Sequence, residues 1–241
     1  MFFNRDERRT RKPGKPPELG TAGSTRFIAP RDGDFGGSWL CVNDQGLTLC
    51  VLNGPTDDDP PEPGEGYRSR GELPTALIEH PSITEVGSML REMELARYRS
   101  FALAGFAADG TTALWDWRGG TLREHPAIDP DVPLISSSFD STAVRRHRVD
   151  LYARMRRLRC DAPEEFHLAY HASHDPQRGP LSPCMHRDDG ETVSLAWIRV
   201  DPAEICFAYS PHSPCVGLPR GLPVRMRRRS IDGARVRDLT D

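Results

Sequence analysis

This sequence has few of the features that mark membrane, secreted or nucleic-acid-binding proteins. It contains no apolar run near the ~20 residues that are needed to span a bilayer. Its first residues are charged, which is unlike a secretory signal. The net charge is −3 at pH 7, so no bulk attraction to nucleic acid or to an anionic membrane is expected. Only Lys12 and Lys15 are lysines, and we attribute this bias to genome composition.

The cysteines form neither a C-x-x-C pair nor a dense framework. They are scattered over the whole chain, at Cys41, Cys50, Cys160, Cys184, Cys206 and Cys215. This spacing favours buried free thiols in a reducing compartment over disulfides. We therefore expect a cytoplasmic protein.

The composition is that of a soluble globular domain. Hydrophobic residues make up 37% and charged residues 28% of the 241 residues, and a chain of this length can bury a sizeable core. We expect one domain over residues 1–241. The arginine-rich stretches at 141–159 and 225–229 have little aromatic interleaving, so we interpret them as solvated faces and expect no nucleic-acid partner.

The pattern of strands and helices predicts an α+β protein. Predicted hairpins cover residues 38–52, 101–124 and 192–209, and helices are predicted between them. The strands at 38–42 and 47–52 are apolar on both faces, which indicates a sheet covered on each side. Prolines make residues 8–24 an extended arm or loop. Residues 54–68 are acidic and rich in proline, and we expect a mobile loop there.

The most distinctive stretch is the polar quartet at residues 4–7, directly behind Phe2 and Phe3. It is followed by three other short motifs in a fixed order. The four motifs are Asn4-Arg5-Asp6-Glu7, Asp32-Gly33-Asp34-Phe35-Gly36-Gly37-Ser38-Trp39-Leu40, Ser69-Arg70-Gly71 and Cys184-Met185-His186-Arg187-Asp188. Their order and spacing resemble the bacterial branch of the NRDE family, also called the transport and Golgi organisation family. The resemblance covers nearly the whole chain.

The resemblance implies a fold and a chemistry. The fold is that of the N-terminal-nucleophile (Ntn) hydrolases, a four-layer αββα sandwich of two antiparallel sheets. In that fold the first residue of the mature chain is the nucleophile and its own α-amine is the base. The family has a cysteine after the initiator methionine, on a strand ahead of the quartet. Here Met1 is followed by Phe2, so either the true start lies upstream or the chemistry has been lost.

For the quartet, the resemblance implies roles that the residue types can perform. Arg5 would hold a carboxylate or a developing oxyanion by bidentate donation. Asp6 and Glu7 would orient Arg5 and the α-amine, and Asn4 would donate an amide hydrogen bond. The alternative is an ion-pair network in which Arg5 and its acidic neighbours fix the arm.

Further candidates lie in the other motifs. Trp39 and Ser38 follow a glycine pair that permits close ligand approach, although a tight turn and a core tryptophan would produce the same pattern. Arg70, at a predicted helix start, is placed to meet an anion, or is simply solvated. His186 and Arg187 precede a strand and are expected in the same cavity as Arg5.

A histidine group gives the sharpest metal or haem signal. Its members share one face of a predicted helix, with Cys184 and His186 further along the chain; they are Glu164, His167, His171 and His174. We interpret this group as a surface histidine cluster and predict no metal.

Two functions from different classes follow. The first is hydrolysis of a linear amide or an acylated small molecule by an Ntn-type mechanism. The second is a non-enzymatic protein that binds haem or an acyl lipid, because eukaryotic relatives are associated with haem trafficking and with lipid or membrane organisation. Either function predicts a small-molecule or lipid-like ligand without stable membrane insertion, and haem is the one cofactor that we consider as a ligand.

Overall fold

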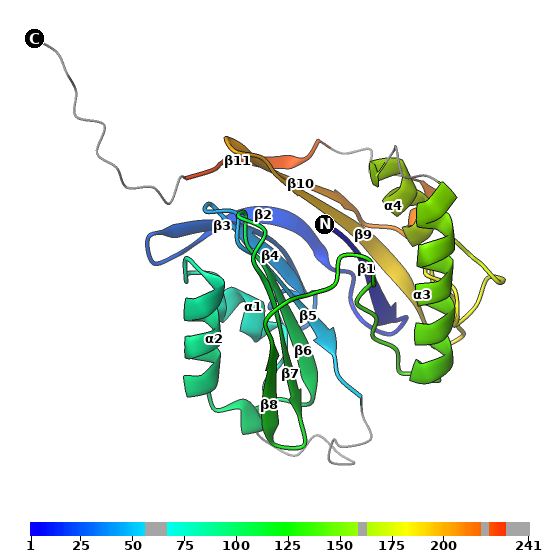
Figure 1. Ribbon diagram of the computed structural model, residues 1–241, viewed down its shortest axis with the longest axis horizontal. Helices are drawn as coiled ribbons and strands as arrows, with labels where there is room; N and C mark the ends of the chain where they lie inside the picture. The colour runs from blue at the N-terminus through cyan, green and yellow to red at the C-terminus, as the bar shows by residue number, and fades with distance from the viewer. Residues whose placement is uncertain (56–66, 159–162, 218–221, 230–241) are drawn as a thin grey trace, which may run out of the picture.

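The computed structural model describes residues 1–55, 67–158, 163–217 and 222–229. Two antiparallel sheets form its centre (Figure 1). The smaller sheet has four strands in the spatial order β1 (Phe2–Arg8), β9 (Gly190–Val200), β10 (Glu204–Ser210) and β11 (Val224–Arg227). The larger sheet has seven strands in chain order: β2 (Lys15–Ala22), β3 (Thr25–Arg31), β4 (Leu40–Asn43), β5 (Thr48–Asn53), β6 (Phe101–Phe106), β7 (Thr112–Arg118) and β8 (Thr121–His125).

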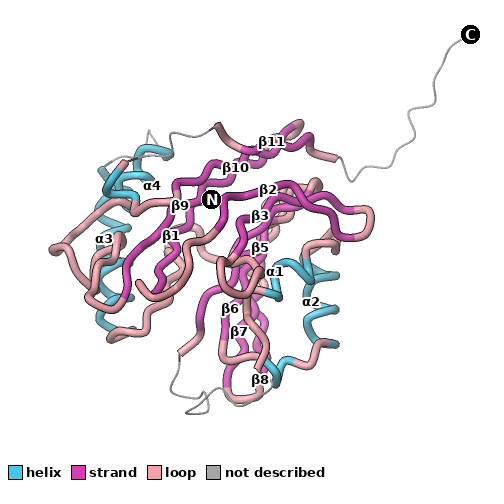
Figure 2. Tube along the Cα trace, turned by 180° about the vertical axis from the view of Figure 1, so that it is seen from behind, coloured by secondary structure: helices cyan, strands magenta, loops and turns pink. Residues whose placement is uncertain are grey.

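Helices cover the outer face of each sheet, which gives four layers in the order α, β, β, α (Figures 1 and 2). On the seven-stranded sheet lie α1 (Glu72–Leu77) and α2 (Ile83–Glu92), followed by the short 3-10 helix η1 (Leu95–Arg97). On the four-stranded sheet lie α3 (Ser141–Leu158) and α4 (Pro163–His171), and the 3-10 helix η2 (Pro214–Val216) follows β10. The predicted α+β class and the αββα layering are confirmed. None of the described helices is long and apolar enough to cross a bilayer.

The main hydrophobic core takes side chains from both sheets and from α1 and α2. Leu40, Cys41 and Val42 of β4 are all fully buried, as expected for a strand that is covered on both faces. The alternation of strand side chains also divides β1 between two layers. The side chains that face α3 and α4 are those of Phe2, Asn4 and Asp6. The side chains that face the other sheet are those of Phe3, Arg5 and Glu7.

Two strands were not predicted from the sequence. Residues 8–24 were expected to be an arm or loop, yet Lys15–Ala22 forms β2. The prolines Pro16 and Pro17 are tolerated because β2 is an edge strand, and its register with β3 is irregular between Lys15 and Glu18. The second strand, β11, lies within the predicted arginine face, and its Met226 is buried while its arginines are exposed. Of the predicted mobile loop 54–68, residues 56–66 lie outside the described part.

The sequence spacing of Ser69 with Glu72 and of Ser82 with Glu85 predicts a capping box at each place, and the two outcomes differ. Ser82 accepts a hydrogen bond from the Glu85 amide, so the predicted cap at the start of α2 is confirmed, and Glu85 accepts in return from the Ser82 hydroxyl. At Ser69 the box does not form. The hydroxyl of Ser69 accepts from the Gly71 amide instead, and α1 begins only at Glu72 without a side-chain cap. Glu72 pairs with Arg68 in place of the cap.

The sequence predicts that the helix from Ser141 carries its apolar side chains inward and its arginines outward, and α3 follows this pattern except at two positions; the predicted inward residues are Val144, Leu151, Met155 and Leu158. Leu158, expected to point inward, is 84% exposed, because the packing between α3 and α4 ends one turn earlier, at Met155. Arg148 was expected to be solvated with the other arginines of this helix, but it is buried. Its position four residues after Val144 and three before Leu151 places it on the inward face of the helix.

Candidate functional site

Arg5 lies at the centre of a buried ion-pair cluster between the two sheets. Its side chain is only 7% exposed. Nη2 donates to Asp32 Oδ2 at 2.6 Å and to Glu7 Oε2 at 3.1 Å. The guanidinium lies over the Trp39 ring, 4.2 Å from its centroid. Arg11 adds a second cation and donates to Asp32 Oδ1 at 2.7 Å. We call these five residues the Arg5 cluster.

The turn after β3 presents Asp32 to both arginines. Asp32 Oδ1 accepts hydrogen bonds from the amides of Asp34 and Phe35, which close the turn locally. Gly36 then adopts a φ of +71°, a conformation that favours glycine. Burial alone would raise the pKa of Asp32, but the Phe35 and Asp34 amides and the charges of Arg11 and Arg5 lower that pKa below its usual value. The carboxylate is therefore ionised at neutral pH.

The geometry matches the ion-pair network that we considered as the alternative role of the quartet. Two carboxylates neutralise the buried guanidinium, and both bind it through the same nitrogen. Arg5 also joins β1 of one sheet to the β3–β4 turn of the other, which stabilises the packing of the sheets. A role of Arg5 and Glu7 in binding a ligand stays a prediction.

Asn4 and Asp6 lie on the opposite face of β1 from Arg5. The Asn4 amide donates to the His171 carbonyl at 2.9 Å and to the Pro183 carbonyl at 3.0 Å. Asp6 accepts a 2.6 Å hydrogen bond from the Thr192 hydroxyl. The prediction that Asp6 orients Arg5 is wrong, because the side chains of consecutive residues in a strand point to opposite faces of the sheet.

Arg148 is a site residue that the sequence analysis missed. It donates to the carbonyls of Leu181 at 3.2 Å and Ser182 at 2.7 Å, and its Nη1 lies 3.9 Å from Asp6 Oδ2. Burial raises the pKa of Asp6, while the Arg148 charge and the Thr192 hydrogen bond act to lower it. Arg148 thus anchors the segment before β9 to α3.

The other predicted ligand-binding residues near the first motifs have internal partners. Ser38 is buried and its hydroxyl donates to the Leu40 carbonyl at 2.8 Å. Trp39 is a core side chain beneath Arg5. Arg70 donates to the Ser100 carbonyl at 2.8 Å and so joins the segment before α1 to the start of β6. Their roles toward a ligand stay predictions, and Ser38 would have to leave its turn to perform one.

His186 and Arg187 do not share a cavity with Arg5, contrary to the expectation. Arg187 pairs with Asp189 and donates to Ser138 at the surface. His186 Nε2 lies 3.5 Å from the sulfur of Cys184 and 3.5 Å from the sulfur of Cys215. Two pockets in the described part of the chain, one beside β10 and one beside the start of α2, are lined by none of the predicted site residues.

The predicted surface histidine cluster is also wrong. His167 and His171 are not solvated but stack on Phe2, with ring centroids 4.9 Å and 5.9 Å apart. Burial lowers the pKa of His167 to about 4 and that of His171 to about 3, so both rings are neutral and serve as packing groups at neutral pH. His174 separates from them and joins His186.

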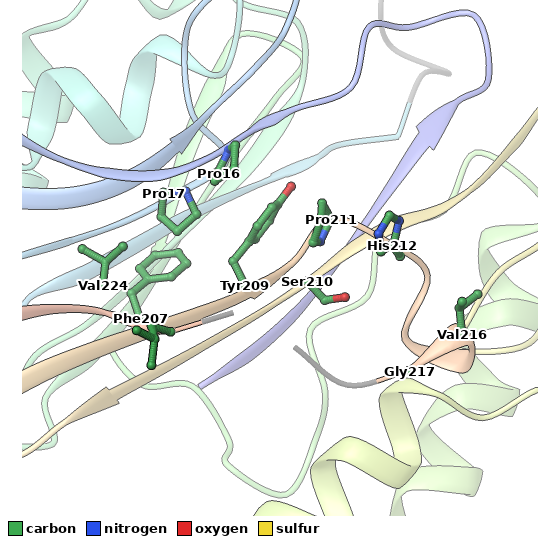
Figure 3. Close-up of a pocket in the computed structure, with 11 residues that line it drawn as sticks. Pro16, Pro17, Phe207, Tyr209, Ser210, Pro211, His212, Val216, Gly217 and Val224 are labelled. Atoms are coloured by element: carbon green, nitrogen blue, oxygen red, sulfur yellow. The ribbon is translucent and has the colours of Figure 1, made fainter. Parts of the chain in front are cut away.

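The larger pocket is a cavity of about 550 Å³ where β2 faces β10 and β11. Figure 3 shows Tyr209 beside Pro16 and Pro211, with Phe207 and Val224 near Pro17. The sequence analysis missed this cavity because two of its walls belong to β2 and β11, which were not predicted. The remaining lining residues are Ser210, His212, Val216, Gly217 and Leu222.

Tyr209 connects the pocket to the Arg5 cluster. Register places Tyr209 opposite Ala196 and Arg5 opposite Ser194, so these side chains share the face of the sheet that looks toward β2. Burial raises the pKa of Tyr209, and the Ser194 hydroxyl and the Arg5 charge act to lower it. The pocket thus has apolar walls and one phenol close to a cation.

Comparisons with known proteins agree with the quartet-based resemblance. The sequence model for "Transport and Golgi organisation 2" matches residues 1–138, and no curated protein matches the sequence significantly. Similar solved structures include penicillin V acylase from Agrobacterium tumefaciens (14% identity, 85% of this chain and 78% of that chain, TM-score 0.47). Another is a variant of conjugated bile acid hydrolase from Clostridium perfringens (9% identity, 99% and 91%, TM-score 0.47). On the match to more than half of its residues, the chain belongs to the Transport and Golgi organisation 2 family.

Proposed function

We propose that this protein binds a small amphipathic molecule with an acyl chain in the pocket between β2 and β10–β11. The observation that carries the proposal is the cavity itself, with its volume of about 550 Å³, apolar walls and a single phenol. Ligand sites are mostly concave, apolar and within roughly 300–1,000 Å³, with few polar groups that fix orientation.

The apolar part of the pocket suits an acyl chain. Phe207 and Val224 supply its floor from the four-stranded sheet, and Pro16 and Pro17 supply the opposite wall. At the rim, Leu222 is 98% exposed. Leaving such a side chain in water is unfavourable by about 1.5–3 kcal/mol relative to full burial, and an apolar ligand would cover it.

The polar part of the pocket suits a head group that accepts hydrogen bonds. The Tyr209 hydroxyl is a hydrogen-bond donor on the pocket wall, so it favours a partner with negative or strongly polar oxygen atoms. A carboxylate or an amide carbonyl at the end of an acyl chain has this chemistry.

Equilibrium titration with a fluorescent fatty acid and with its acyl amide tests the proposal. Leu222→Asp should weaken binding about tenfold or more, because a carboxylate at the rim must lose water when the chain enters. Leu158→Asp is the matched control, since Leu158 is an exposed leucine on α3 outside the pocket. Equal affinities for both variants, or no saturable binding by the wild type, would refute the proposal.

Haem is the alternative ligand of the same class. His212 is the imidazole among the lining residues, and a neutral imidazole is a common axial ligand of haem iron. A haem titration separates the two ligands. A shifted Soret band that His212→Ala abolishes would identify haem, whereas an unshifted band at excess protein leaves the acyl ligand.

Amide hydrolysis is the second candidate, and the family match favours it, because the resemblance to that family implies an N-terminal cysteine nucleophile. Met1 carries no thiol or hydroxyl, so this route needs a longer chain whose own first residue supplies both the nucleophile and the free α-amine. In such a chain the nitrogen of Met1 is a peptide amide and takes no part as the base. The genomic reading frame upstream of Met1 tests this candidate. An in-frame Met-Cys segment would support hydrolysis, and so would the release of amine from N-acyl substrates by the longer chain.

A further inference from the structure

We propose that His174, Cys184, His186 and Cys215 bind one structural zinc ion. One ligand atom from each of the four residues lies within 4.8 Å of the other three. The four come from two regions that are distant in sequence: the segment between α4 and β9, and η2 after β10. We call them the Cys2His2 cluster.

The distances fit a tetrahedral site. With Zn–S bonds near 2.3 Å and Zn–N bonds near 2.0–2.1 Å, neighbouring ligand atoms lie roughly 3.3–3.8 Å apart. Nε2 of His186 is 3.5 Å from the sulfur of Cys184 and 3.5 Å from that of Cys215. All remaining pairs fall within 4.8 Å, so small side-chain rotations close the site. Four protein ligands leave no open position, which is typical of structural rather than catalytic zinc.

One buried nitrogen of the Cys2His2 cluster has no hydrogen-bond partner among the described residues. It is Nε2 of His174. Burying a polar atom without a partner is unfavourable, and a metal ion bound at this nitrogen removes that cost. The His174 and His186 rings meet edge to face with centroids 5.1 Å apart, so both rings border the same small volume.

The surroundings of His186 resemble the outer shell of a zinc site. Its Nδ1 lies 3.5 Å from Glu191 Oε2, and a carboxylate at this position orients the ring so that Nε2 faces the metal. Arg178 Nη2 lies 3.3 Å from the same Nδ1, and Arg9 pairs with Glu191 Oε1 at 2.8 Å and balances its charge. Zinc with two thiolates is neutral, so the bound site adds no net charge, and two thiol protons pass to solvent on binding.

Hydrogen bonds to backbone carbonyls hold the ligand-bearing segments in place without the metal. The Cys184 amide donates to the Ser173 carbonyl at 3.0 Å, next to His174. The Ser213 hydroxyl donates to the Thr192 carbonyl at 2.6 Å and so fixes the start of η2 against β9. The zinc ion would lock η2 to the segment before β9, and the residues after Cys215 line the rim of the proposed acyl pocket.

Cobalt titration tests the proposal, because tetrahedral thiolate-bound Co²⁺ is coloured and Zn²⁺ is not. Wild-type protein, stripped of metal by a chelator under reducing conditions, should bind about one Co²⁺ per chain with tetrahedral d–d bands and a thiolate charge-transfer band. One equivalent of Zn²⁺ should displace it. Protein purified without chelators should carry about one zinc per chain by elemental mass spectrometry.

Matched variants separate the cluster from other thiols and imidazoles. Cys215→Ser should reduce the charge-transfer intensity to about half, since one of two thiolates remains, and His174→Gln should weaken Co²⁺ binding at least about 100-fold. Loss of an outer-shell partner alone costs about 10–100-fold. Cys206→Ser and His125→Gln are the controls, because neither residue belongs to the cluster. Circular dichroism of each variant verifies that it folds.

Three results would overturn the proposal. The first is wild-type protein that binds no Co²⁺ or Zn²⁺ under reducing conditions. The second is equal metal binding by Cys215→Ser and Cys206→Ser. The third is a Cys184–Cys215 disulfide that persists in the protein as isolated, detected by intact mass and thiol counting, because both thiols must be free to bind metal.

Discussion

The Arg5 cluster and the Cys2His2 cluster are both built from segments far apart in the chain, but they differ in how their polar atoms are paired. In the Arg5 cluster, carboxylates from Glu7 and Asp32 meet the cations directly. In the Cys2His2 cluster, two soft sulfur atoms and an unpaired imidazole nitrogen face one another. A cluster whose charges cancel internally stabilises the fold, whereas one that leaves a buried nitrogen unpaired calls for a ligand.

The two clusters also differ in their location in the fold. The Arg5 cluster lies between the two sheets and joins β1 to the β3–β4 turn. The Cys2His2 cluster lies at one end of the four-stranded sheet, where long connections meet. The quartet therefore makes contacts that stabilise the fold in the described chain, its role toward a ligand stays a prediction, and the sites that we propose for ligands lie outside it.

The largest expected effect is on folding stability. Arg5→Met should lower the free energy of unfolding by about 3 kcal/mol, because it leaves the carboxylates of Glu7 and Asp32 with the more exposed Arg11 as their remaining cation in the cluster. Arg11→Met is the control, since its more exposed side chain leaves Asp32 paired with Arg5. Urea denaturation measures both variants. If Arg5→Met lost no more stability than Arg11→Met, the Arg5 cluster would not have the structural role assigned to it.

The second largest expected effect is an increase in the free energy of unfolding when metal is added. Free Zn²⁺ at 100 times its Kd contributes about 2.7 kcal/mol to the free energy of unfolding. For a chain of this size that corresponds to a rise in Tm of roughly 5–10 °C. Differential scanning calorimetry of the metal-free wild type and of Cys215→Ser, with and without Zn²⁺, measures it. A rise of equal size in both proteins would argue against the Cys2His2 cluster as the binding site.

Acid should weaken the Arg5 cluster through Asp32 by less than the metal effect. Its folded-state pKa lies below the unfolded value near 3.9, so its contribution is present above about pH 4 and is lost as pH falls through the folded pKa. Asp32→Asn lacks this contribution at every pH. The stability difference between wild type and Asp32→Asn should be constant from pH 5 to 7 and shrink below pH 4, as followed by urea denaturation. A difference that grew on acidification would contradict the ionised state of Asp32.

The smallest effect is expected at the phenol of the acyl pocket. Tyr209→Phe removes one hydroxyl and keeps the ring, so affinity for a fluorescent fatty acid should fall about fivefold, in line with one hydrogen bond of about 1 kcal/mol. Affinity for an apolar probe without a head group should not change. An equal loss for both probes would mean that the substitution acts through packing rather than through the head group.

The sequence predicted elements where local chemistry decides the outcome. Glycine turns and apolar runs were enough for the hairpins, and the Ser82–Glu85 pair was enough for the start of α2. Prediction from the sequence failed where the structure of a segment depends on distant parts of the chain. Pro16 and Pro17 argue against a strand until β2 is known to be an edge.

The same limit explains the site predictions. Arg5 and Trp39, two candidates from different motifs, do meet between the sheets. Cys215 was not connected with Cys184, since 30 residues separate them without a metal-binding spacing. The burial of Arg148 could have been predicted, because its spacing from Val144 and Leu151 places it on the inward face of α3. Its charge instead favoured the interpretation that it is solvated.

X-ray absorption at the zinc edge tests the contrast between the two clusters most directly. On wild-type protein with one bound zinc, we predict a first shell of two sulfur atoms at about 2.3 Å and two nitrogen atoms at about 2.0–2.1 Å. A shell of oxygen and nitrogen atoms without sulfur would place the metal elsewhere and contradict the account.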